Sequence, residues 1–257
     1  MDALRSLERR ALLARAKNIT ESTRGLDTLV LAPHPDDEAL GCGGTIAVKR
    51  GARAKVTVCF ATDGEQSSRS RTLGAPKIAT KRRQEALAAC GALGVGADDV
   101  RFFAFGDGNL GRAGADLAAT IAGVIDEIEP AELLIPTEID WHEDHRALAA
   151  AALVAVEHSS VSPSILAYPV WFWNRASWVD PRASRTRQRV QTWTRPLSAI
   201  VHLQPRVVHV STVLHCKEAA LDAYAEELAQ FGPSFRDRFL EPQELLFNLS
   251  AGSSSAE

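Results

Sequence analysis

The sequence predicts an α/β fold in which a mostly parallel sheet carries helices on both faces. Short apolar segments typical of strands alternate with helical segments through most of the chain. Glycine or proline stands at several of the boundaries between them. The chain has 257 residues, of which 46% are hydrophobic, so it can bury one large core without disulfide bonds.

The first half of the chain alternates strand and helix twice. Residues 28–33 (TLVLAP) are predicted to form a buried strand that ends at a proline-rich turn. The helix that follows opens in the glycine-rich stretch and stops at Gly51. Residues 55–62 are rich in β-branched side chains, which favours a second strand. Around these elements we expect a helix at 3–17, a polar loop at 63–76 and a helix at 77–93.

The second half continues the alternation. Residues 101–105 and 132–137 are short apolar segments that we expect to be strands, and Pro130 ends the helix between them, 115–128. Residues 1–249 are therefore predicted to form a single domain. We further expect a helix from 142–145 onward, strands at 165–173 and 206–212, a helix at 215–231 and a disordered tail at 250–257.

Composition excludes several classes of protein. A net charge of −3 gives no sign of a nucleic-acid partner. The longest apolar stretch, 147–156, is too short for a transmembrane segment. The charged N-terminus has no apolar signal region, and four widely spaced cysteines without a CxxC pair suit a reducing compartment. A cytoplasmic protein is the expected outcome.

Polar clusters follow three of the predicted strands. They occupy 34–38 after the first strand, 63–65 after the second and 138–145 after the fourth. In a parallel sheet, ligands bind at the carboxyl ends of the strands. The three clusters are therefore expected to share one cleft.

The first cluster is the run Pro33-His34-Pro35-Asp36-Asp37-Glu38. A histidine nitrogen and a carboxylate oxygen suit Zn²⁺, and adjacent carboxylates repel one another unless a cation neutralises them. A solvated turn with a helix-capping acid is the alternative, and it explains a lone HPD better than it explains the complete run.

The second cluster is His142-Glu143-Asp144-His145, at the start of a predicted helix. Two histidines three positions apart lie near one face of a helical turn, so one can bind a metal while the other points into the cleft. Asp144 can hold one imidazole in a fixed tautomer. A polar helix terminus with exposed histidines is the alternative. Together with the first cluster, two histidines and one aspartate make a zinc site with an open fourth position.

These motifs in this order resemble those of the LmbE-like or PIG-L family of zinc-dependent N-deacetylases. The similarity rests on PHPDDE-ALGCGGT, then TDGE, then D-x-H-x-D-H, over about 28–150. It is weaker at Arg82-x-x-Glu85, at Asp107-Gly108 and in the helix that carries Tyr224. Glu143 departs from the proline of many members. The resemblance implies a Rossmann-like fold with a variable C-terminal region, and removal of an acetyl or other acyl group from an amino sugar of the N-acetylglucosamine type.

The resemblance also implies the residues of the site. His34, Asp37 and His145 would bind one Zn²⁺ per chain, and Fe²⁺ or Co²⁺ also suit such a site.

Asp36 would be the general base that takes a proton from the attacking water. A protonated His142, supported by Asp144, would stabilise the oxyanion. Whether Asp36 or His142 protonates the leaving amine stays open.

Candidate substrate-binding residues lie around this centre. The TDGE acids follow the second strand, where they would bind sugar hydroxyls or else cap a turn. Arg82 would reach the substrate or pair with Glu85 in its own helix. Tryptophan faces can stack on a sugar. The candidates are Asp63, Glu65, Arg82, Trp171 and Trp173.

Residues 165–200 form a variable segment rich in tryptophan and arginine. Six arginines and one acid lie between positions 174 and 198. This composition suits a rim that binds an anionic or lipid-linked small-molecule conjugate, or equally a subunit interface of a homo-oligomer.

Three other functions compete with the deacetylase. One is a zinc amidase that acts on a non-sugar amide, and another is a binding protein without activity. The third is a nucleotide-binding Rossmann protein whose Gly41-Cys42-Gly43-Gly44 cradles a phosphate. The spacing is not GxGxxG and the preceding acids repel phosphate, so close packing of a helix on the sheet explains these glycines better.

Overall fold

The computed structural model describes residues 3–172, 184–187, 191, 194, 201–232 and 234–249. Parallel strands form the larger part of its sheet, and they follow the predicted alternation with helices. These strands are β2 (Thr28–Ala32), β3 (Val56–Thr62), β4 (Val100–Phe105), β5 (Glu132–Pro136) and β6 (Ser164–Tyr168).

The other strands extend the sheet beyond β6. β8 (Gln243–Leu249) pairs antiparallel with β6 and with β7 (Pro205–His209), and the short β1 (Lys17–Asn18) pairs parallel with β7. The order across the described sheet is β1-β7-β8-β6-β5-β2-β3-β4. The mostly parallel α/β fold is therefore confirmed, while β8 is a strand that the sequence analysis missed.

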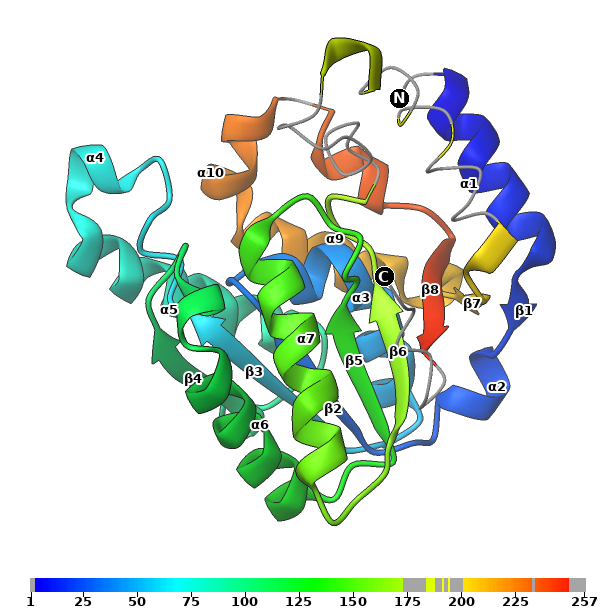
Figure 1. Cartoon of the computed structure of the whole chain (residues 1–257), viewed down its shortest axis with the longest axis horizontal. Coiled ribbons are helices and arrows are strands. Elements are labelled where there is room, and N and C mark those ends of the chain that lie inside the picture. Colours follow the sequence, from blue (N-terminus) through cyan, green and yellow to red (C-terminus); the bar gives the residue numbers. More distant parts are fainter. Residues whose placement is uncertain are drawn as a thin grey trace.

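Helices lie on both faces of the sheet (Figure 1). One face carries α6 (Gly114–Ile128) and α7 (Glu143–His158). The other carries α3 (Asp37–Gly51), α5 (Ala75–Ala92) and α9 (Leu214–Ala223). Further helical segments in the described part of the chain include α1 (Ala3–Arg15), α2 (Thr20–Thr23), α4 (Ser70–Leu73), α10 (Ala225–Leu228), η1 (Ala97–Asp99), η2 (Leu110–Arg112), η4 (Ser211–Val213), η5 (Ala229–Phe231) and η6 (Arg236–Phe239).

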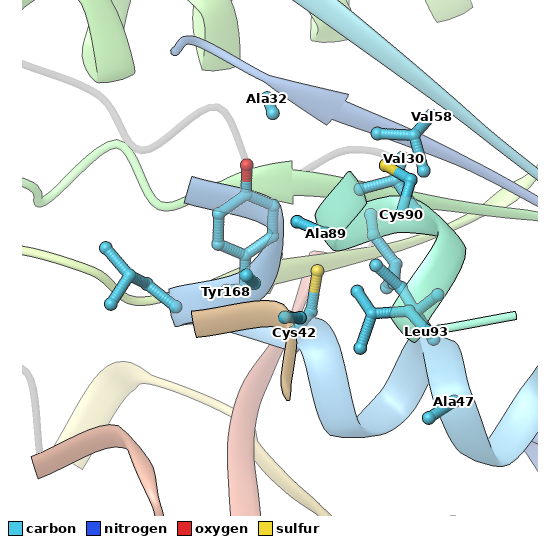
Figure 2. Packing of buried hydrophobic residues seen from close by; sticks show 14 of the residues in the cluster. Val30, Ala32, Cys42, Ala47, Val58, Ala89, Cys90, Leu93 and Tyr168 are labelled. Atoms are coloured by element: carbon cyan, nitrogen blue, oxygen red, sulfur yellow. The ribbon is translucent and has the colours of Figure 1, made fainter. Parts of the chain in front are cut away.

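Each face of the sheet has its own hydrophobic core. Along β2, Val30 and Ala32 point into one core and Leu29 and Leu31 into the other, as the alternation of a strand requires. Figure 2 shows side chains of the first core, among them Val30, Cys42 and Tyr168. Burial on both faces explains why the predicted strands are continuous apolar runs.

Several boundaries differ from the predictions for physical reasons. The strand predicted at 165–173 ends at Tyr168, directly before a proline. The helix predicted at 215–231 is interrupted at Tyr224, whose side chain is buried and bonded to Glu38. The helix expected to open in the glycine-rich stretch begins earlier, at Asp37, and has a kink at Cys42.

The strand order reverses between β2 and β5, since β3 and β4 follow on one side of β2 and β5 and β6 on the other. The carboxyl ends at such a reversal are where ligands bind in open α/β sheets. The loops after β2 and β5 carry the two predicted motifs. Among the described helices, none has the length and apolar character needed to cross a bilayer.

Candidate metal centre and active site

The turn after β2 holds a strained aspartate. Asp36 caps α3 with a φ of 122°, a value that non-glycine residues rarely adopt. Glu38 holds this conformation, because its Oε2 accepts the Asp36 N–H at 3.1 Å. Tyr224 in turn donates its hydroxyl to Glu38 Oε1 at 2.8 Å. The strain is therefore supported by buried contacts, as is typical of functional turns.

The Asp37 carboxylate lies between two imidazoles. Its Oδ2 is 3.2 Å from His34 Nδ1 and 3.2 Å from His145 Nε2. Ligand atoms bound to tetrahedral Zn²⁺ at about 2.0–2.1 Å stand about 3.3 Å from one another. His145 Nε2 is buried, and its 3.2 Å approach to Asp37 lacks the geometry of a hydrogen bond, although a buried polar atom normally makes one. The donor atoms predicted to bind the metal therefore fit such an ion.

The outer nitrogen of each imidazole faces a carboxylate. Nδ1 of His145 lies 2.8 Å from Asp140 Oδ2. Nε2 of His34 lies 3.1 Å from Asp107 Oδ1 and 3.2 Å from Asp144 Oδ2. These carboxylates favour a proton on the outer nitrogens, which leaves the inner lone pairs for a metal.

Two further groups of donors lie close together. The imidazoles of His34, His142 and His145 form one, and His34 with Asp107 and Asp144 forms the other, each within 4.8 Å. The first group places the ring of His142 beside the same centre. The second consists of groups that orient His34.

Without a metal, this cluster binds protons instead. Burial by itself lowers the pKa of His145, but Asp37 and Asp140 raise it to about 9. Burial likewise opposes protonation of His34, yet hydrogen bonds to Asp107, Asp144 and Asp37 raise its pKa well above the ordinary value. The cluster therefore attracts positive charge, and a metal that binds there must displace protons.

The pKa of Asp36 lies in the range that suits proton transfer near neutral pH. Burial raises its pKa to about 7, while Arg82 opposes that rise. The Arg82 guanidinium lies 3.0 Å from Asp36 Oδ2 and also donates to the Pro35 carbonyl. Only 3% of Arg82 is exposed, and it lies 3.5 Å from Glu85, which favours the structural alternative over substrate binding.

His142 differs from the expected imidazolium. Burial, together with His34 and His145, lowers its pKa to about 4. Its Nδ1 accepts the backbone N–H of Asp144 at 3.2 Å, so the proton of the neutral ring sits on Nε2. The structure thus favours a neutral N–H donor at this position.

Asp144 also has a different partner from the one expected. Its carboxylate contacts His34 and accepts the backbone N–H groups of Gly108 at 2.7 Å and Leu110 at 3.1 Å. Only its backbone N–H reaches the His142 ring. The hydrogen bonds of the Asp144 carboxylate therefore orient His34, whereas the sequence analysis expected them to support His142.

The TDGE acids have partners within the protein. Asp63 makes a two-pronged ion pair with Arg83, at 2.8 and 2.9 Å. Glu65 Oε1 accepts the backbone N–H of Asp107 at 2.9 Å. These contacts favour the turn-stabilising alternative over sugar binding for both residues.

An aromatic row leads away from His142. The Trp141 ring lies edge-on to His142 at 6.2 Å and to Trp171 at 6.4 Å. Trp171 continues onto Phe231 at 5.1 Å and Phe235 at 5.2 Å. Trp141 is 49% exposed, so it offers a face beside the centre. Trp173, the other predicted tryptophan, lies outside the described residues.

The sequence analysis assigned no role to three residues of this site: Asp107, Asp140 and Trp141. Asp140 was visible as the first acid of D-x-H-x-D-H, but its role depends on contact with His145. Asp107 was quoted only within the weak Asp107-Gly108 likeness, and its place after β4 was a second signal. Trp141 had no signal beyond its place next to His142.

Comparison with known proteins agrees with this geometry. Residues 29–156, which contain both motifs, match the family model described as "PIG-L: GlcNAc-PI de-N-acetylase". The "Probable N-acetyl-alpha-D-glucosaminyl L-malate deacetylase 2" of Bacillus cereus is 33% identical over 136 residues, which are 50% of this chain and 60% of that protein. The chain thus spans about three-fifths of the length of the first curated relatives that it matches.

Two further likenesses extend over more of the chain. The "1D-myo-inositol 2-acetamido-2-deoxy-alpha-D-glucopyranoside deacetylase" of Mycobacterium sp. is 27% identical over 237 residues, covering 78% of this chain and 74% of that protein. The solved structure of N,N'-diacetylchitobiose deacetylase from Pyrococcus horikoshii aligns with a TM-score of 0.66 and 17% identity, over 97% of this chain and 92% of that one. At that identity the structural likeness shows the fold.

Proposed function

Because this chain belongs to the PIG-L (LmbE-like) family, we propose that it is a metal-dependent hydrolase that removes an N-acetyl or other acyl group from an amino-sugar conjugate of the N-acetylglucosamine type. The observation that carries the proposal is the Asp37 oxygen placed 3.2 Å from both His34 and His145, with Asp36 beside it. These groups lie where the strand order reverses, at the expected place for a ligand.

His34, Asp37 and His145 would hold the metal, for which Zn²⁺ is the first choice and Fe²⁺ or Co²⁺ are substitutes. Bound there, Zn²⁺ supplies a Lewis acid that polarises the amide carbonyl and lowers the pKa of water. Asp107, Asp140 and Asp144 keep the two imidazoles in the tautomers that metal binding needs.

Asp36 removes a proton from the water that attacks the acyl carbon. With a pKa of about 7, it is partly ionised at neutral pH and can accept that proton. His142 presents Nε2–H as a neutral donor to the carbonyl oxygen as negative charge develops there. When the C–N bond breaks, the amine takes a proton and acetate is released. Asp36 then carries the transferable proton, so we assign it this second transfer.

The conjugate attached to the sugar is the open part of the proposal. Trp141 and Trp171 give aromatic faces against which a sugar ring can stack. Arg185 and Arg187 are exposed, which suits an anionic or lipid-linked group. We extend the proposal to a small-molecule substrate and a cytoplasmic location, and the arginine-rich segment suits a substrate rim and a subunit interface equally.

Acetate release tests the proposal directly. The purified protein would be incubated with a panel of N-acetylglucosamine derivatives, with and without chelation and metal restoration, beside Asp36→Ala. We expect turnover that chelation removes, that zinc restores and that Asp36→Ala nearly abolishes. Stoichiometric zinc without acetate release would contradict the sugar substrate and point to a non-sugar amide. A protein that binds no zinc and releases no acetate would overturn the assignment of the metal centre.

A further inference from the structure

The helix that carries the metal-binding acid is broken. Within α3, Cys42 has non-helical angles of φ −144° and ψ 20°. Before this break, a single turn carries Asp37 and Glu38, with Asp36 as its cap. One helical turn is not stable by itself in water, so its direction depends on the contacts that hold the break.

A buried carboxylate occupies the amino end of the helix beyond the break. Glu244 of β8 accepts the backbone N–H of Gly44 at 2.7 Å and that of Thr45 at 2.6 Å. The Thr45 hydroxyl also donates to it at 2.7 Å. A side chain at Gly44 would stand 2.7 Å from Val210 and 3.0 Å from Glu244, so glycine is required. The amides of the candidate phosphate loop are therefore already bonded to an anion of the protein itself.

A buried lysine binds the backbone on the other side of the break. Nζ of Lys217, on α9, lies 2.6 Å from Glu244 Oε1 and donates to the Leu40 carbonyl at 3.0 Å. Lys217 is 1% exposed and Glu244 is 5% exposed. The cation thus lies at the carboxyl end of the first turn and the anion at the amino end of the next segment. Both signs match the helix dipoles.

Leu40 connects this ion pair to the general base. Its carbonyl accepts from Lys217, while its N–H donates to the Asp36 carbonyl at 2.9 Å. On its other side the first turn rests on Tyr168, because a Cβ at Gly41 would stand 2.1 Å from that ring. The turn is therefore fixed at its carboxyl end by Lys217 and against the sheet by Tyr168.

We propose that Lys217 and Glu244 are positioning residues for the reaction: they set the angle of α3 at Cys42 and thereby aim the carboxylates of Asp36 and Asp37. The inference rests on the proposed function. Both residues lie outside the 29–156 region that the family model matches, so only the tertiary structure brings them close to the site.

The same helix offers a matched control. Near its other end, Lys49 Nζ lies 2.8 Å from Glu132 Oε2, and these residues are 0% and 3% exposed. Lys49 also donates to the Thr23 carbonyl at 2.7 Å. This pair has the same chemistry and burial. It lies at the amino end of β5, however, whereas the metal-binding residues follow the carboxyl ends of the strands.

The experiment compares Lys217→Met/Glu244→Gln with Lys49→Met/Glu132→Gln in the full chain. Each double variant removes both charges, which avoids leaving one buried charge unpaired. Zinc affinity of the metal-free protein is measured by competition with a chelator, alongside Tm and the separate values of kcat and KM. We expect the first variant to bind zinc about tenfold more weakly or worse, as loss of groups that orient metal ligands does elsewhere. We also expect kcat to fall about tenfold with KM little changed. The control is expected to lose Tm alone.

Wild-type zinc affinity and kcat in Lys217→Met/Glu244→Gln would overturn the inference, as would an equal loss in the control. If that variant does not fold, Thr45→Val takes its place, since it removes one hydrogen bond to Glu244 and little else. A folded Thr45→Val with wild-type zinc affinity would also overturn it. A wild-type protein that binds no zinc would sink the proposed metal site and this inference together. One that binds zinc but releases no acetate leaves the zinc measurement to decide the inference alone.

Discussion

Oδ2 of Asp37 lies 3.2 Å from Nε2 of His145, although the two residues follow different strands of the sheet. The reversal of strand order between β2 and β5 brings them together. Their pairing predicts how metal and protons compete for the same place.

The metal-free protein is expected to lose stability as pH rises. The folded pKa of His145 is about 9, above the ordinary value of about 6.5. Its stabilising contribution is therefore fully present below about pH 6.5 and lost as pH rises through about 9. Tm of the apoprotein at pH 6 and pH 9.5 checks this. Asp37→Asn serves as the control, because without the carboxylate the pH dependence should shrink; an unchanged dependence would refute the assignment to this pair.

Asp36→Asn is expected to separate chemistry from metal binding. The amide cannot accept the proton of water, so kcat should fall about 10²- to 10⁴-fold. Zinc content should stay stoichiometric, because Asp36 is not one of the three ligands assigned here. Acetate release and metal analysis on the same preparation measure both. Loss of zinc in Asp36→Asn would mean that Asp36 is itself a ligand.

Arg82 is expected to set the acid limb of the pH–rate profile. Arg82 lowers the pKa of Asp36, so its removal should raise that pKa above about 7. Since the base must be ionised, activity is lost as pH falls through this pKa, and the midpoint of kcat/KM should move to higher pH in Arg82→Met. Arg82→Lys, which keeps the positive charge, should shift less. Identical midpoints in all three proteins would show that Arg82 does not act on Asp36.

Gly41 and Gly123 are expected to respond in opposite directions to alanine. A Cβ at Gly41 would stand 2.1 Å from the Tyr168 ring, and such overpacking costs about 1–3 kcal/mol or more. Gly123, inside α6, has nothing within 4 Å of its added Cβ. Gly123→Ala should therefore stabilise the protein by about 0.5–1 kcal/mol. Urea unfolding of both variants gives the two free energies, and a tolerated Gly41→Ala would contradict the close packing against Tyr168.

Trp141→Ala is expected to weaken substrate binding without unfolding the protein. The ring is half exposed and contacts His142 and Trp171 edge-on. Loss of one aromatic contact is worth about 0.5–1.5 kcal/mol, so KM should rise about two- to tenfold with Tm unchanged. Leu87→Ala, at an exposed position of α5, is the control. If KM stays constant in both, Trp141 does not contact the substrate.

Much of the fold could be predicted because β2, β3 and β5 are buried on both faces and therefore consist of apolar runs. The motifs after β2 and β5 could be placed in one cleft, since parallel strands end at one edge of the sheet. β8 escaped prediction because its apolar run is short and Glu244 precedes it directly. That glutamate is buried through its contacts with Gly44, Thr45 and Lys217. The expectation that residues 1–249 form a single domain stays a prediction.

The contacts between the side chains of the site were harder to predict than the identity of the residues that form it. Whether Asp144 supports His142 or His34 depends on the direction of a side chain at the start of α7, which spacing alone does not determine. The neutral state of His142 follows from burial and from a backbone N–H that occupies Nδ1. The break at Cys42 depends on residues more distant still, on α9 and β8.

The position of β8 has a consequence for the order of folding. It is the last strand of the described chain, yet it lies between β7 and β6. Until β8 inserts, β1 and β7 cannot join the rest of the sheet, and Glu244 cannot reach Gly44. Contacts between residues so far apart in sequence cost more loop-closure entropy, so we expect them to form late. A nascent or partly refolded chain would thus contain every metal ligand before the site is complete. We therefore expect the ability to bind zinc to appear only in the last step of folding.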